Sequence, residues 1–155
     1  MFRRRKNLIV FLNAMSTGFF AGFFLSAFHI AIHYFNISKV SHEMVLNHFF
    51  IEGDWINKWY GYIFFIFFIS FLSIFSAILY YLLFRKIKGW FVGFVYGVIF
   101  WMTFGFLIPL LFYNISFSEL FTSRTNVATI CSFILYGIFI GYSISYDYEI
   151  TIQDH

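Results

Sequence analysis

Two histidines four residues apart, His29 and His33, are the residues of this 155-residue chain whose spacing best suits chemistry. Side chains at positions i and i+4 project from the same face of a helix, so the two rings could offer nitrogens to a metal ion or relay a proton. A metal site needs three or four ligands. The others would have to come from elsewhere in the chain.

The segment 36–58 contains further candidate ligands: His42, Glu43, His48, Glu52 and Asp54. Their spacings match no zinc motif of the H-E-x-x-H kind, and a histidine near a membrane interface can simply reach the water among the headgroups. We therefore expect no metal and no cofactor. The candidate polar site is His29, His33, His48 and Asp54, with a metal or proton site as the alternative to an interfacial role.

The same segment has signals for local structure. Ser41 can cap a short helix with Glu43 in its first turn, and Gly53 can end it. Such a helix would lie on the membrane with its apolar side down. Asp54 would then cap the helix that follows, and Trp55 and Trp59 would anchor its outer end among the headgroups.

The composition shows what surrounds these residues. The chain is 61% hydrophobic, 27% aromatic and only 11% charged, whereas soluble domains are about 25% charged. The uninterrupted apolar runs are 7–35, 59–84, 90–113 and 126–146. Each exceeds the roughly 20 residues that a helix needs to cross a bilayer. The sequence predicts an all-α membrane protein, a single integral membrane domain over 1–155 that forms a four-transmembrane-helix bundle with a short interfacial helix in its first loop.

The positions of the charged residues limit the chemistry that the apolar runs could perform. None of the 17 Asp, Glu, Lys or Arg residues falls inside the apolar runs. The strong polar groups at depth are Asn13, Thr17 and the two histidines. No nucleophile elbow, phosphate loop or pair of intramembrane acids is present. Cys131 is the single cysteine, so no disulfide can form within the chain, and we expect it to act as a small hydrophobic residue. An interior without charge favours packing and binding over catalysis.

The basic residues predict the orientation. Seven of the ten lie before the first run or between the second and third: Arg3, Arg4, Arg5, Lys6, Arg85, Lys86 and Lys88. Loops rich in Lys and Arg face the cytoplasm. We expect a multi-pass membrane protein with both termini in the cytoplasm, and no basic surface that would bind nucleic acid.

Small residues four apart predict how the helices pack. They form one stripe on each of three helices, including Gly18 and Gly22, Gly93 and Gly97, and Gly137 and Gly141. In the first run, Asn13, Ser16 and Thr17 lie on the face opposite its glycines, which suits a helix with protein on both sides. The second run has serines instead, which can bond to their own helix. Pro109 should bend the third run.

Several stretches resemble the YqhR family of small bacterial integral membrane proteins. They are Tyr80–Gly89 (YYLLFRKIKG), Tyr96-Gly97, Leu135–Glu149 (LYGIFIGYSISYDYE), Met44-Val45-Leu46 and Gly53-Asp54-Trp55. The resemblance covers about 18–149. It implies a four-helix protein of the cytoplasmic membrane in Gram-positive bacteria and implies no activity. The family pattern has no histidine at the position of His48, which argues against a site built on it.

Two functions remain open from the sequence. The first is a non-enzymatic scaffold or accessory subunit, whose partners would be the lipid bilayer and either a membrane protein or a second copy of this chain. The second is a small transporter, channel or metal-handling protein that uses His29, His33 and the outer loop. Tyr142, Tyr146 and Tyr148, together with Asp147 and Glu149, form either an interfacial belt, which we favour, or a docking patch.

Overall fold

A computed structural model describes residues 2–38, 41–48, 53–84, 86–87, 89–104 and 123–153, and these residues form helices and no strands. The helices are α1 (Phe2–Tyr34), α2 (His42–His48), α3 (Trp59–Phe84), α4 (Trp90–Met102) and α7 (Ser123–Gln153). The predicted all-α membrane fold is confirmed: α1, α3 and α7 contain stretches long and apolar enough to cross a bilayer.

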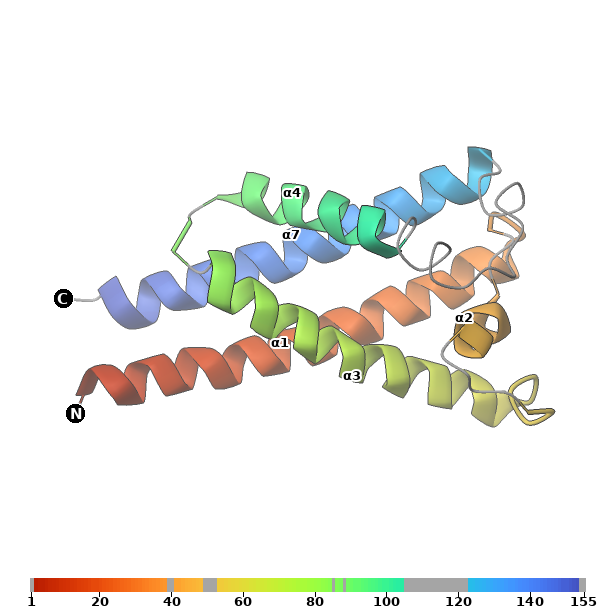
Figure 1. Ribbon diagram of the computed structural model, residues 1–155, viewed down its shortest axis with the longest axis horizontal. Coiled ribbons are helices and arrows are strands. Elements are labelled where there is room, and N and C mark those ends of the chain that lie inside the picture. The colour runs from red at the N-terminus through yellow and green to blue at the C-terminus, as the bar shows by residue number, and fades with distance from the viewer. Residues whose placement is uncertain are drawn as a thin grey trace.

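The four long helices run alternately in opposite directions (Figure 1). The first residues of α1 and the last residues of α7 therefore lie at the same end of the bundle, and α2 lies at the other end beside the start of α3. The closest pairs are α1 with α3 and α4 with α7, and α1 also packs along α7. The fold is thus two tightly packed pairs joined along the seam between α1 and α7.

Helix α4 is 13 residues long, shorter than the predicted run 90–113. Thr103 and Phe104 continue it as a wider helical turn, and Thr103 Oγ1 donates to the carbonyl of Ile99 at 2.9 Å. The remainder of that run, including the bend expected at Pro109, lies outside the described residues.

Two helices are longer than their apolar runs. Helix α1 begins at Phe2 instead of residue 7, and α7 continues to Gln153 instead of ending at 146. A helix ends where its backbone hydrogen bonds end, and neither extension contains a proline or glycine to interrupt them. Asp147 and Glu149, which follow the predicted run 126–146, consequently lie inside α7.

The first loop differs partly from expectation. Helix α2 begins directly after Ser41 with Glu43 in its first turn, but its apolar Leu46 is fully buried against Ile56 and Phe65 of the protein. The prediction that Asp54 caps the next helix is wrong. A turn occupies residues 54–57, where the backbone N–H of Ile56 donates to the carbonyl of Gly53 at 3.1 Å, and α3 starts only at Trp59.

Helices α1 and α3 touch backbone to backbone at the glycines of α1. A methyl group added to Gly22 would lie 2.6 Å from the Cα of Ser70, and one on Gly18 would lie 2.9 Å from the carbonyl oxygen of Ser73. Neither contact leaves room for a side chain. Such close approach allows the extensive van der Waals contact that holds helices together in lipid.

Helices α4 and α7 meet in the same way, with glycines on both sides. A methyl group on Gly93 would lie 2.6 Å from the carbonyl oxygen of Gly137, and one on Gly137 would lie 2.5 Å from the Cα of Gly97. Gly141 faces the Cα of Gly93, also at 2.5 Å from its missing methyl position. The four glycines form one continuous contact between the two backbones.

Buried hydroxyl pairs connect α3 to the other pair of helices. Ser73 Oγ lies 2.7 Å from the phenol oxygen of Tyr136, and Ser76 Oγ lies 2.7 Å from that of Tyr96. The Tyr96 hydroxyl donates its proton to the carbonyl of Ser76 at 2.9 Å, so the Ser76 hydroxyl must be the donor to Tyr96. The serines of α3 were expected to bond to their own helix; Ser70 does so, to Ile66, whereas Ser73 and Ser76 bond across helices.

Candidate binding groove between α1 and α7

The two faces of α1 have different partners, as the sequence indicated. Gly18 and Gly22 face α3, whereas Asn13 and Thr17 line a groove shared with α7. This groove is open on the surface of the bundle and encloses a volume of about 320 Å³. That volume is at the lower end of the range of about 300–1,000 Å³ that is typical of small-molecule sites.

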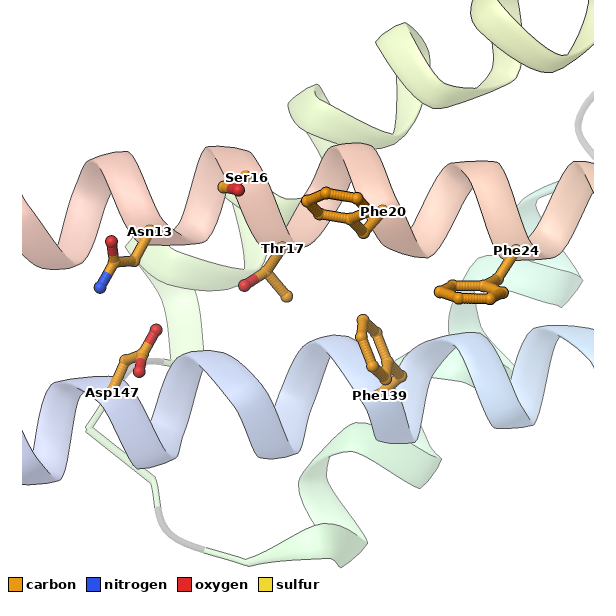
Figure 2. Close-up of a pocket in the computed structure, with 7 residues that line it drawn as sticks. All are labelled: Asn13, Ser16, Thr17, Phe20, Phe24, Phe139 and Asp147. Atoms are coloured by element: carbon orange, nitrogen blue, oxygen red, sulfur yellow. The ribbon is translucent and has the colours of Figure 1, made fainter.

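Figure 2 shows the polar end of the groove, where Asn13 of α1 faces Asp147 of α7. The side-chain amide of Asn13 donates a hydrogen bond to the Asp147 carboxylate. Thr17 stands one turn further along α1, with its hydroxyl directed toward this pair and its methyl group directed away from it. Ser16 completes the polar lining.

The other end of the groove is aromatic. Phe20 and Phe24 of α1 and Phe139 of α7 line it. The rings of Phe24 and Phe139 lie 6.5 Å apart between centroids at an angle of 64°, close to an edge-to-face contact. The site is therefore amphipathic along its length.

The depth of the site follows from helix geometry. Asn13 is seven residues beyond Lys6 on α1, or about 10 Å along the axis. Asp147 is six residues before the end of α7, about 9 Å. The polar end is consequently set inward from the basic end of α1, and the phenylalanines lie deeper still. An ionisable side chain at such a depth is costly unless it has a function or a partner.

The side chains that line the groove include an acidic one and no basic one. Asp147 is the one ionisable residue among the side chains that line the groove, and none of them is Lys, Arg or His. The groove offers a carboxylate, two hydroxyls and an amide next to aromatic rings. These groups can bind and orient a ligand, but none of the described lining residues forms a nucleophile–base pair.

Comparisons with known proteins identify the family. The family model described as "Conserved membrane protein YqhR" matches residues 2–155. The chain belongs to the YqhR family. It is similar to a Bacillus subtilis (strain 168) protein described as "Uncharacterized protein YqhR", with 35% identity over 134 residues, which cover 86% of this chain and 75% of the relative. No solved structure matches it.

In this YqhR-family chain the predicted histidines have local contacts at the end of the bundle where α2 lies. The His29 ring packs on Phe65 of α3, with centroids 5.8 Å apart. His33 donates from Nδ1 to the carbonyl of Ser38, at 3.1 Å, which holds the turn after α1. Each ring thus has a structural contact within the first loop and its neighbouring helix.

The remaining predicted site residues do not gather around that pair. Asp54 is exposed in the turn before α3, and His48 is the last residue of α2, with its side chain outside the described part. It is His42 that joins His29 on Phe65: its ring stacks on Tyr62 at 3.9 Å, and its Nε2 donates to the carbonyl of Ile56 at 3.1 Å. Among the described residues of this YqhR-family chain, no three His, Cys, Asp or Glu side chains come close enough together to hold a metal ion.

The sequence predicted the α1 side of the groove but not its α7 side. The sequence indicated a polar face with Asn13, Ser16 and Thr17, but it placed Asp147 in an interfacial belt or docking patch and not opposite that face, because the apolar run of α7 ends one residue earlier. A signal was available: Phe139, Ser143 and Asp147 recur every four residues and so share a helix face. Extending α7 along that face would have brought the carboxylate to α1.

Proposed function

We propose that this YqhR-family member is a non-enzymatic membrane protein, a small scaffold or accessory subunit that binds another membrane component in the α1–α7 groove. The observation that carries the proposal is the lining of that groove, which is polar at Asn13 and Asp147 and aromatic at Phe24 and Phe139. A surface of this kind recognises a ligand that also has a polar and an apolar part.

The choice of binding over catalysis rests on the chemistry of the lining. Ser16 and Thr17 are weak nucleophiles unless a base activates them, and Asp147 is already hydrogen-bonded to Asn13. Acid–base catalysis by carboxyl groups uses two of them in different environments. One carboxylate supports recognition of charge.

The proposed location is the cytoplasmic membrane, with the ends of α1 and α7 in the cytoplasm. Two observations support it: those ends lie together in Figure 1, and the basic residues of the chain concentrate at the start of α1 and between α3 and α4. The polar end of the groove would then open at the level of the inner leaflet.

Co-purification from the native membrane tests the proposal. The protein would be extracted in mild detergent and analysed by native mass spectrometry as the wild type, as Thr17→Phe, which places a ring in the groove, and as Leu8→Phe. Leu8 is 57% exposed on α1 and does not line the groove, so it is the matched control.

We expect a bound component of constant stoichiometry in the wild type and in Leu8→Phe, and its loss in Thr17→Phe with helicity by circular dichroism unchanged. A wild type that comes down alone would contradict the proposal. So would a component that Thr17→Phe retains.

A further inference from the structure

Asp147 is the one ionisable residue among the described side chains that line the groove, and it lies at the polar end. No ion pair to Asp147 is found within the part of the chain that the structure describes, where its hydrogen-bond partner is the neutral amide of Asn13. The basic residues nearest in sequence to Asn13, Lys6 and Arg5, lie about 10 Å or more further along α1. A ligand group placed at Asp147 therefore meets a carboxylate and is favoured if it is cationic.

The acceptors around this point outnumber the donors. An ionised carboxylate has about four acceptor positions, of which the Asn13 amide uses one. The Thr17 hydroxyl, directed toward the same place, adds two acceptor positions and one donor. A primary ammonium has three N–H donors and no acceptor, and so complements this end of the groove.

The aromatic end of the groove indicates that the ligand also has an apolar part. Phe139 lies eight residues before Asp147 on α7, about 12 Å along the axis, and Phe24 lies eleven residues beyond Asn13 on α1, about 16 Å. The aromatic end thus points toward the bilayer centre, while the carboxylate lies nearer the basic end of α1. Lipid molecules in that leaflet have the same polarity, with headgroup outward and chains inward.

From this geometry we infer that the groove binds a phospholipid whose headgroup ends in a primary ammonium. The ammonium donates to Asp147 and Thr17, and one acyl chain lies along Phe24 and Phe139. This inference rests on the proposed function, because it names the component that occupies the same groove. It adds a selectivity: an ammonium lipid binds better than an anionic lipid with the same chains.

The experiment presents the purified full chain, stripped of native lipid, with an equimolar mixture of phosphatidylethanolamine, phosphatidylcholine and phosphatidylglycerol that share acyl chains. Native mass spectrometry counts each lipid retained. We expect about tenfold more phosphatidylethanolamine than phosphatidylglycerol, the factor that one hydrogen bond to a charged group supplies. Phosphatidylcholine, a cation without N–H donors, should fall between them.

Variants assign the preference to the carboxylate. Asp147→Asn is nearly the same shape without the charge, so the three lipids should then be retained about equally. Asp147→Glu keeps the charge and should keep the order of preference. Free ethanolamine added in excess should not displace the lipid if the acyl chain contributes; displacement would show that the site takes the amine alone and would overturn the assignment to a lipid.

The outcomes separate this inference from the proposed function. If the wild type and Leu8→Phe retain lipid, Thr17→Phe does not, and no headgroup is preferred, the groove is a binding site and the ammonium inference is wrong. If Thr17→Phe retains as much lipid as the wild type, both proposals are wrong. If Asp147→Asn does not fold, the lipid mixture is tested with the wild type and Asp147→Glu alone. The inference is contradicted if both of these proteins retain the three lipids equally.

Discussion

The phenol oxygen of Tyr136 on α7 lies 2.7 Å from Ser73 Oγ on α3, in a part of the bundle where both side chains are buried. The pair links the α1–α3 half of the fold to the α4–α7 half at a point where the two backbones make few close contacts. In lipid, where the hydrophobic effect does not drive helices together, such a hydrogen bond holds one particular arrangement of the two halves.

Replacing Tyr136 by Phe should therefore weaken the connection between the halves. The substitution keeps the ring but removes the hydrogen bond and leaves the Ser73 hydroxyl without this partner, for a loss of about 0.6–1.5 kcal/mol in the free energy of unfolding. Denaturation by sodium dodecyl sulphate, followed by circular dichroism, measures it. Tyr142→Phe is the control, since Tyr142 is 59% exposed, and a double-mutant cycle with Ser73→Ala should recover the loss as coupling. An additive double mutant would refute the role of the pair.

The glycine contact between α4 and α7 should tolerate no side chain. In Gly137→Ala the new methyl group would lie 2.5 Å from the Cα of Gly97, so the two backbones must move apart, at a cost of about 1–3 kcal/mol from overpacking. Thermal unfolding in detergent is the measurement. Cys131→Ala, a substitution at an exposed position of the same helix, should leave the melting temperature unchanged. Equal melting temperatures for the two variants would mean that the pair is not packed through Gly137.

From the sequence, the existence of each helix could be predicted better than the residue at which it ends. The face of a helix that packs could be predicted better than the residues it packs against. Glycines four residues apart mark the side of a helix that can approach another helix closely. The glycine sides of α1, α4 and α7 do lie against neighbouring backbones. Helix α7 continues past the predicted run 126–146 because hydropathy changes at the first charged residue, whereas backbone hydrogen bonding does not. Those few added residues include Asp147, which the sequence placed in an interfacial belt or docking patch and which gives the groove its charge.

The serine–tyrosine pairs could not be predicted for a different reason. A serine on a membrane helix can bond to a carbonyl four residues earlier or to a neighbouring helix, and its own sequence surroundings permit both. Ser70 and Ser73 are three residues apart on α3, yet the first bonds to Ile66 and the second to Tyr136. Only the placement of α7 decides between these partners.

We expect that His29 and His33 bind no metal ion. His29 packs on Phe65 and His33 donates to the carbonyl of Ser38, so we expect that Zn²⁺ leaves the melting temperature of the wild type unchanged. The double variant His29→Leu, His33→Leu should lose some stability from the turn contact and keep all lipid retention by the groove. Isothermal titration of the purified protein with Zn²⁺ is the direct check. Saturable binding that the double variant loses would restore the metal-handling hypothesis and count against the groove as the functional site.

The orientation leads to a test with single cysteines in a Cys131→Ala background. Lys58 lies just before α3 and Lys86 just after it, so the two positions are on opposite sides of the membrane if α3 spans it, and both side chains are exposed. Since the basic residues concentrate around Lys86 and at the start of α1, we expect Lys58→Cys to react with a membrane-impermeant maleimide on intact cells and Lys86→Cys to react only after the cells are opened. Labelling of both on opened cells controls for reactivity. The reverse pattern would place the polar end of the groove, with Asp147, in the outer leaflet, and the lipid that reaches it would have to come from that side.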